Sequence, residues 1–281
     1  MKYRVIKGKF HVKGFSPDGD SIRFEAANDA NWDALQWSQP AARSNPKKQL
    51  RFEAIDALET HYEESHQPRS FGFGALEVLL GLLGITGVRY NLSLTRITAA
   101  QDGTEGFIAT QGLDMYDRPI SLVFAGTTTV KDGRQVTLKQ LPMDRCANLR
   151  MVQLGLAYPT FYSSMGPDLL KLFTDVTIAC RQGLVGLWAL DKTGGFTLHN
   201  TSTITDDVVI LPKLFRRLTK FFLECSTFEE LPAYLRETRD RVLVRKPRVK
   251  ATLDQLLIIS PDGRQIALTQ PPENLIFDPK G

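Results

Sequence analysis

The first half of the sequence consists of short β-prone segments, each bounded by Gly, Asp or Pro, and this pattern constrains the fold more than any other feature. Helical periodicity follows at 144–157 and 166–182, after one buried helix expected at 72–84. Short strands followed by helices favour an α+β layout, in which helices pack on a small closed barrel. The expected strands are 2–12, 21–26, 49–56, 88–100, 104–116, 119–126 and 135–141.

The composition is that of an ordinary soluble globular protein, with 281 residues, 42% of them hydrophobic and 23% charged. A formal net charge of +4 is compatible with a polyanionic partner but does not require one. The three cysteines, Cys146, Cys180 and Cys225, form no CxxC or Cys/His cluster. We therefore expect reduced thiols in the core, without a disulfide framework or a zinc site.

The N-terminal segment alternates polar and apolar residues and lacks the apolar run of a secretion signal. The most apolar stretch, 75–85, is too short to span a bilayer and carries Glu77. These features predict a cytoplasmic protein without a membrane partner.

A polar insert between the second and third expected strands carries Trp32 and Trp37. A small cluster packed on the body of the domain is favoured over exposed indoles. The sequence changes character near 193–195, which predicts a catalytic domain at 1–192 and a small α+β domain at 193–281. The latter should contain two helices, one of them opened by a capping box from Thr227 to Glu230, and a closing hairpin.

Three separated fragments carry the residues that could take part in chemistry at a site. They are "DGDS" at 18–21, "LRFEAIDALE" at 50–59 and "DMYDR" at 114–118. Each alone has an ordinary structural interpretation. The first is a common hairpin turn, the acids of the second are typical of a helix N-terminus, and the arginine of the third could be a solvated charge.

Together the fragments resemble the staphylococcal nuclease, or thermonuclease, family. That family carries Asp-Gly-Asp-Thr, then Arg followed by apolar residues and Asp-Thr-Pro-Glu, then Asp-x-Tyr-Gly-Arg. The resemblance extends from residue 2 to about 190 and implies an OB-like five-stranded β-barrel with packed helices. Ala57 and Leu58 replace the family's Thr-Pro, and Asp117 replaces its glycine. The corresponding residues are Asp18, Gly19, Asp20, Ser21, Arg51, Asp56, Glu59, Asp114, Tyr116, Arg118, Asn148, Gly155, Leu156, Ala157, Tyr162 and Trp188.

The chemistry of phosphodiester hydrolysis explains this set of residue types. In-line attack by water builds charge on the phosphoryl oxygens, so the site needs a hard cation, guanidinium groups and a proton acceptor. Asp20 and Asp56 supply oxygen ligands suited to calcium, with magnesium or manganese as alternatives. The resemblance implies the Ala57 carbonyl as a further ligand.

Two arginines and one glutamate complete the expected catalytic set. Arg51 and Arg118 can each meet a phosphate through a planar fork. Glu59 is placed to orient or deprotonate the attacking water, and its role as the base is implied by the resemblance alone. In a straight strand Arg51 and Asp56 would face opposite sides, so a bulge or strand end is expected between them.

The substrate-binding candidates fall into two groups. In the expected catalytic domain they are Asp114, Tyr116, Tyr158 and Tyr162, where base stacking and core packing are both open interpretations for the tyrosines. For the cations of the C-terminal region, three interpretations are open: they extend the nucleic-acid track, dock an acidic partner, or form a solvated helix face. These cations are Lys213, Arg216, Arg217, Lys220, Arg239, Arg241, Arg245, Lys246, Arg248 and Lys250, of which Arg245, Lys246, Arg248 and Lys250 are the substrate-binding candidates.

The sequence therefore predicts a metal-dependent nuclease that hydrolyses DNA, RNA or both with little sequence specificity. By resemblance, the products carry 3′-phosphate ends. One alternative is a non-catalytic nucleic-acid-binding or protein-binding module. Another is the nuclease effector subunit of a larger assembly, such as an anti-phage defence system, with the C-terminal domain docking a protein partner.

Overall fold

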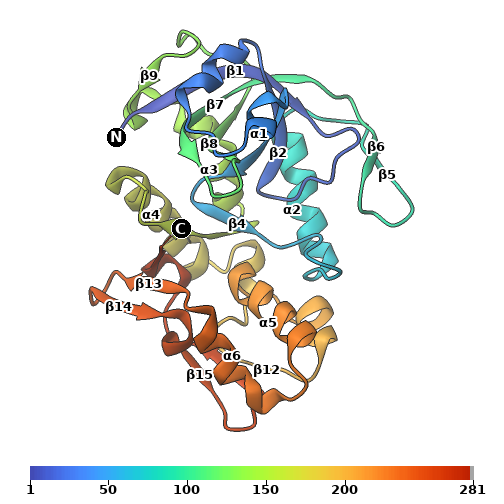
Figure 1. Cartoon of the computed structure of the whole chain (residues 1–281), viewed down its shortest axis with the longest axis vertical. Helices are drawn as coiled ribbons and strands as arrows, with labels where there is room; N and C mark the ends of the chain where they lie inside the picture. Colours follow the sequence, from blue (N-terminus) through green and yellow to red (C-terminus); the bar gives the residue numbers. More distant parts are fainter. Residues whose placement is uncertain (279–281) are drawn as a thin grey trace. The chain divides into compact units, whose positions relative to one another are not determined.

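Five strands of the first half of the chain close into a barrel in a computed structural model that describes residues 1–278 (Figure 1). The strand order is β1-β2-β3-β8-β7, and β7 pairs back onto β1. Within the barrel, the β3–β8 pair is parallel and the other pairs are antiparallel. The α+β class and the closed five-stranded barrel predicted from the sequence are confirmed. The barrel strands are β1 (Tyr3–His11), β2 (Ser21–Ala26), β3 (Lys47–Phe52), β7 (Thr104–Leu113) and β8 (Pro119–Ala125).

Pairs of aromatic rings pack across neighbouring strands of the barrel. Phe107 stacks on Phe124 with ring centroids 4.6 Å apart, and Phe10 lies against Phe24 at 5.2 Å. All four side chains are buried. Burial of such a side chain contributes about 1.5–3 kcal/mol, so the alternating pattern that predicted these strands also supplies much of the free energy that holds them together.

The chain forms two compact units that are not continuous in sequence. Unit 1 comprises residues 1–55 and 75–151, and unit 2 comprises 56–74 together with 152 onward. The chain changes unit within β4 (Ile55–Ala57), α2 (Arg69–Leu82) and α3 (Ala147–Gln153). We expected a boundary near 193–195, but residues 152–192 belong to the same unit as the C-terminal region.

Unit 1 adds short elements to the barrel. The segment expected as a strand at 88–100 forms only a small hairpin outside the barrel, and the one at 135–141 is a strand for two residues. The remaining elements of unit 1 are η1 (Asp29–Ala34), α1 (Pro40–Ser44), β5 (Arg89–Tyr90), β6 (Ile97–Ala99), β9 (Gln135–Val136), η2 (Leu138–Gln140) and η3 (Met143–Arg145).

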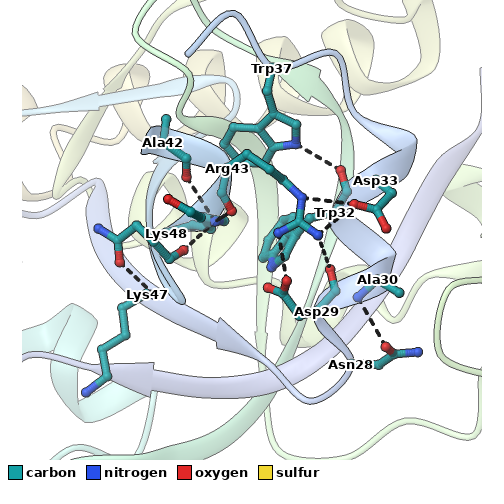
Figure 2. A network of polar contacts seen from close by, with 12 residues as sticks. Asn28, Asp29, Ala30, Trp32, Asp33, Trp37, Ala42, Arg43, Lys47 and Lys48 are labelled. Atoms are coloured by element: carbon teal, nitrogen blue, oxygen red, sulfur yellow. Dashed lines mark hydrogen bonds and ion pairs between the residues drawn. The ribbon is translucent and has the colours of Figure 1, made fainter. Parts of the chain in front are cut away.

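The polar insert of unit 1 packs on the barrel, as the sequence favoured. Trp32 is buried edge-on against Phe24 and Trp37, and the Trp37 indole donates to the Trp32 carbonyl at 2.9 Å. Figure 2 shows the polar contacts that fasten this insert, with Arg43 bound to both Asp29 and Asp33. The buried ammonium of Lys48 lies over the Trp37 ring and donates to three backbone carbonyls, those of Ala42, Arg43 and Asn45.

Unit 2 has its own core around helix α5 (Pro212–Glu224). Leu214, Phe215 and Leu218 are fully buried on one face of this helix. The capping box from Thr227 to Glu230 is present. A four-stranded sheet (β11-β17-β13-β14) and a three-stranded sheet (β12-β16-β15) lie in this unit, and β10 pairs with β4, of which Asp56 and Ala57 belong to unit 2. Its other elements are β10 (Ala157–Pro159), β11 (Phe161–Tyr162), α4 (Pro167–Gln182), η4 (Gly186–Ala189), β12 (Phe196–Thr197), η5 (Thr203–Asp207), η6 (Phe228–Glu230), α6 (Leu231–Thr238), β13 (Arg241–Val244), β14 (Val249–Thr252), η7 (Leu253–Leu256), β15 (Leu257–Ile259), β16 (Gln265–Leu268), η8 (Pro272–Asn274) and β17 (Leu275–Phe277).

Two further sequence expectations can be compared with the structure. Cys146 and Cys180 are buried free thiols, as predicted, while Cys225 is partly exposed. No helix within residues 1–278 has the length and apolarity needed to cross a membrane.

Two glycines face each other where the barrel closes. Gly8 of β1 pairs with Gly106 of β7, and β1 also begins its pairing with β2 at Gly8. A Cβ at Gly8 would meet the Glu25 carbonyl oxygen at 2.0 Å, and one at Gly106 would meet the Phe10 ring at 2.2 Å. The strands can approach this closely only because neither position carries a side chain.

We expect Gly8→Ala and Gly106→Ala each to lower the free energy of unfolding by about 1–3 kcal/mol, the usual cost of overpacking. Gly112→Ala is the matched control on β7, because nothing lies within 4 Å of its added Cβ. Urea denaturation of the three variants measures the difference. Equal stabilities would show that the barrel does not depend on the glycine pair.

Candidate functional site

Strand register brings three of the predicted site residues to one end of the barrel. Ser21, the residue after Asp20, pairs with Arg51, and Arg51 pairs with Ile120, two residues after Arg118. Asp20 also accepts the Phe52 N–H through its backbone carbonyl at 3.0 Å. Asp20, Arg51 and Arg118 therefore lie at the ends of three adjacent strands, β2, β3 and β8.

The turn between β7 and β8 is organised by Asp114. One oxygen of its buried carboxylate accepts the N–H groups of Tyr116 and Arg118, both at 2.9 Å. The other accepts from Nε and Nη2 of Arg118, each at 2.7 Å. Asp114 thus fixes the plane of the guanidinium of Arg118, whose side chain is 35% exposed.

Tyr116 lies on the surface beside this arginine. Its side chain is 69% exposed, and the Arg118 guanidinium carbon is 5.5 Å from its ring centroid. An exposed aromatic face next to an oriented guanidinium can stack a base while the cation meets a phosphate.

Asp117 occupies the position at which the resembled family has glycine. Its φ of +58° lies in the left-handed region, which glycine adopts most readily and in which aspartate is tolerated. Its carboxylate accepts from the backbone N–H groups of Ser38 and Gln39 and from the Ser38 hydroxyl. The Ser38 N–H and these other bonds hold the pKa of Asp117 below its ordinary value. The charge is therefore used to tie the turn to the polar insert.

The strand end expected between Arg51 and Asp56 is present. β3 stops at Phe52, Ala54 has a φ of +73°, and β4 begins at Ile55. The side-chain alternation of a straight strand does not continue through such a turn. Arg51 and Asp56 are therefore not held on opposite faces of one straight strand.

The buried amide of Asn148 secures this strand end within unit 1. Its Nδ2 donates to the carbonyls of Glu53 and Ser121, both at 2.9 Å, and its Oδ1 accepts the Val123 N–H at 2.9 Å. The amide thus satisfies backbone groups of Glu53 and Val123 and adds a second bond to the Ser121 carbonyl, which also accepts the Glu53 N–H.

In unit 2, Asp56 and Glu59 share one arginine. Arg216 of α5 donates from Nη1 and Nη2 to the two oxygens of Asp56, at 3.1 and 2.6 Å, and Nη1 also bonds Glu59. Burial acts to lower the pKa of Arg216, but the two carboxylates outweigh it and raise the pKa well above its ordinary value. The guanidinium therefore stays charged and holds both acids.

The loop that carries Glu59 is fixed by a buried glutamine. The Gln67 N–H donates to the Glu59 carbonyl at 2.9 Å, and the Glu59 N–H donates to the Gln67 side chain at 3.3 Å. Gln67 also donates to the Ile210 carbonyl at 2.8 Å, just before α5. Glu59 and Arg216 are thus held on one framework.

The arrangement of Asp56 does not fit a resident divalent cation. Both of its oxygens are already bonded to Arg216, whose positive charge repels a second cation at the same carboxylate. Within residues 1–278, no group of three or more His, Cys, Asp or Glu side chains is placed to hold a metal ion. The expected set of Asp20, Asp56 and the Ala57 carbonyl, with calcium, stays a prediction.

The two remaining tyrosine candidates lie in unit 2. Tyr158 is buried edge-on against Trp188, with ring centroids 5.0 Å apart, and donates to Asp191 at 2.7 Å. Burial, and then the Asp191 charge, raise its pKa well above the ordinary value. Tyr162 is half-buried against the same core. Core packing, one of the two interpretations left open, is what the structure shows for Tyr158.

The cations of α5 are paired with acids rather than solvated. Lys213 and Arg217 both contact Asp240, and Lys220 lies 4.0 Å from Glu63. Sequence analysis assigned none of these partners. The only signal was the concentration of cations on one amphipathic helix, which does not indicate which acid each one meets.

The basic segment after α6 divides into two parts. Arg245 donates to the Thr174 hydroxyl at 2.6 Å and to the Glu273 carbonyl at 2.9 Å, so it fastens β13 to neighbouring elements of unit 2. Lys246, Arg248 and Lys250 are exposed at the turn between β13 and β14. Like Arg239 and Arg241 earlier in the segment, these three cations are exposed to solvent.

Glu53, which sequence analysis passed over, is a buried acid directly after β3. Its Oε2 has no hydrogen-bond partner among the described residues, and the side chain is 6% exposed. Burial raises the pKa of Glu53 to about 7, although the Arg51 charge acts in the opposite direction. The strand-end position adjoining the predicted site was the signal that could have found it.

Comparisons with known proteins do not assign the chain. Its sequence matches no model of a protein family and no curated protein.

The Asp117 turn can be tested by comparing two substitutions. Asp117→Gly and Asp117→Ala both lose the Ser38 and Gln39 bonds, but only alanine keeps a Cβ at positive φ. We expect the thermal midpoint of the alanine variant to be the lower of the two. Identical midpoints would mean that the turn carries no conformational constraint.

Glu53 should make the stability of the chain pH-dependent. The folded chain keeps this carboxyl protonated up to about 7, whereas the unfolded chain releases the proton near 4.5. The raised pKa means that stability falls as the pH rises through this window, by roughly 3 kcal/mol in total. Urea denaturation of wild type and Glu53→Gln at about pH 5 and pH 8 should show this decline only in wild type.

The control for this measurement is Glu105→Gln, since Glu105 is an exposed acid on β7. Its variant should keep the decline. The same decline in Glu53→Gln would assign the pH dependence to another group.

Proposed function

We propose that this chain hydrolyses phosphodiester bonds of DNA, RNA or both, as a nuclease of the staphylococcal nuclease type. The observation that carries the proposal is the meeting of Asp20, Arg51 and Arg118 at the ends of three adjacent barrel strands. These residues come from fragments that are each unremarkable alone. Their convergence supports a common role on a phosphate group.

Arg118 is the best-defined part of the proposed site. Asp114 holds one edge of its guanidinium, and no described residue bonds its Nη1. An oriented guanidinium stabilises the charge that develops on phosphoryl oxygens in the transition state. We assign Arg51, at the same end of the barrel, a parallel role.

Glu59 is the proposed group that orients or deprotonates the attacking water, and Asp56 is its companion acid. Both are buried or nearly so and are held by Arg216. Catalysis through either acid therefore requires Arg216 to move away. Asp56 does not fit a metal ion while this pairing stands.

Little sequence specificity is expected of such a site. Tyr116 offers a ring face for stacking, and the exposed Lys246, Arg248 and Lys250 are suited to backbone phosphates. Stacking and phosphate contacts do not read base edges. Products with 3′-phosphate ends follow from the family resemblance.

One observation favours a second function, a non-catalytic module that binds nucleic acid or protein. Arg216 holds both acids on which hydrolysis would depend, and a permanent pair of this kind would leave a binding surface without catalysis. Such a module could also serve as one subunit of a larger assembly.

The deciding experiment incubates purified chain with labelled single- and double-stranded DNA and RNA, in calcium, magnesium, manganese or chelator. We expect Arg118→Ala to lower kcat by roughly 10³- to 10⁵-fold, the range for arginines that meet transition-state charge. Glu59→Gln should nearly end cleavage. The exposed Arg134 supplies the control, Arg134→Ala, which should cleave like wild type.

Two results would count against hydrolysis. Nucleic acid bound but left intact in every metal would favour the binding module. Full activity of the Glu59 variant would remove Glu59 from the site.

A further inference from the structure

The β5–β6 hairpin of unit 1 presents two leucines to water at its turn. Neither of its strands joins the barrel, and Figure 1 shows the hairpin projecting from the side of it. Leu92 is fully exposed and Leu94 is 45% exposed. Single exposed apolar residues are common on protein surfaces, so exposure alone assigns no role to them. The construction of the turn, its anchoring and its charge carry the argument.

The turn that carries the leucines is ordered by Asn91. Its side-chain oxygen accepts the N–H groups of Thr95 and Arg96, at 2.9 and 3.0 Å, and its amide N–H donates to the Thr95 hydroxyl at 3.1 Å. Leu94 has a φ of +59°, which a branched side chain seldom adopts. The turn therefore holds Leu92 in a preformed position, and insertion into a partner would cost little ordering of the loop.

The hairpin is fastened to the loop that leads to Asp20. The Ile97 N–H donates to the Phe15 carbonyl at 3.0 Å, and the Ile97 carbonyl accepts the Gly14 N–H at 2.8 Å. Nε of Arg96 donates to the Gly14 carbonyl at 2.8 Å. Residues 14, 15 and 20 all lie in the loop between β1 and β2. The hairpin and one member of the proposed phosphate site thus share one loop.

The charge of the hairpin complements a polyanion. Residues 85–101 include Arg89 and Arg96 and contain no aspartate or glutamate. Both arginines are exposed, one at the start of β5 and the other directly before β6, so they flank Leu92 along the chain. An apolar tip with a cation on either side matches a groove of duplex DNA, where phosphates line both edges of the stacked bases.

We infer that the β5–β6 hairpin is a wedge that inserts Leu92 between neighbouring base pairs of a DNA duplex, with Arg89 and Arg96 on the phosphates. Leucine is one of the side chains that proteins insert between base steps to unstack and bend a duplex. A membrane surface is disfavoured, because two leucines bury too little apolar area for stable attachment to a bilayer. The inference rests on the proposed function for its ligand, and it specifies the double-stranded form.

The test measures duplex binding and base unstacking. Full-length wild type and variants are mixed, in chelator, with a short DNA duplex that carries 2-aminopurine at TA steps, which unstack most readily. The fluorescence of this base rises when it leaves the stack. We expect wild type to raise the fluorescence, and Leu92→Ser to lose most of the rise and bind about 10-fold more weakly.

The matched control is Leu223→Ser, because Leu223 is also an exposed leucine but lies on α5 of unit 2. It should bind and unstack the duplex like wild type. Since Leu92 is fully exposed, Leu92→Ser should keep the thermal midpoint of wild type, so a loss of binding cannot be assigned to unfolding.

The salt dependence of binding tests the flanking cations. Each phosphate contact contributes about 0.9 to the slope of log K against log salt concentration for duplex DNA. Arg89→Gln should therefore flatten the slope by about 0.9, whereas Leu92→Ser and the exposed-arginine control Arg134→Gln should leave it unchanged. Arg89 is the cleaner choice, because Arg96 also anchors the hairpin to Gly14.

Three results would overturn the wedge. The first is a wild type that leaves the 2-aminopurine stacked, and the second is an equal fluorescence rise in wild type and Leu92→Ser. The third is binding to phosphatidylserine vesicles that depends on Leu92 and occurs without duplex unstacking, because the tip would then contact a membrane surface.

The two proposals fail separately. Unstacking that depends on Leu92, without cleavage of any nucleic acid, would leave the wedge standing and remove the nuclease. Cleavage by wild type without unstacking of the duplex would do the reverse.

Discussion

The end of strand β3 is the constraint on which the proposed site depends. The ladder to β8 stops at Phe52, and the Glu53 N–H makes its last bond to Ser121 at 3.0 Å. The buried Asn148 amide then donates to the Glu53 carbonyl and adds a second bond to the Ser121 carbonyl, which satisfies the backbone where the chain leaves the barrel. Arg51 lies just before this exit, and Asp56 follows it along the chain.

Guanidinium–carboxylate pairs organise candidate residues in each of the two units, with opposite effects. In unit 1, Asp114 holds Arg118 from one edge and leaves the rest of the fork directed outward. In unit 2, Arg216 covers the acids themselves. The same interaction thus presents a cation in one place and masks two anions in the other.

The fold class followed from the sequence because it depends on local signals. Alternating apolar residues and Gly, Asp or Pro turns defined β1, β2, β7 and β8, and helical periodicity defined α2, α4 and α5. The unit boundaries did not follow. They lie within β4, α2 and α3, where continuous periodicity hides that one element serves two cores. The strand expected at 49–56 was likewise split by the turn at Ala54, since no sequence signal marks an alanine at positive φ.

By itself the sequence determined which residues are suited to act on a phosphate group, because residue type and spacing carry that information. These residues are Asp20, Arg51, Asp56, Glu59, Asp114 and Arg118. Tertiary structure alone decided what each one contacts. Tyr158 packs in the core and donates to Asp191, and Arg245 bonds β13 to neighbouring elements of unit 2. Asp56 pairs with an arginine 160 positions away in the sequence. Periodicity reports only which face of an element is apolar, whereas the pairing of charges distant in sequence depends on how the folded chain brings them together.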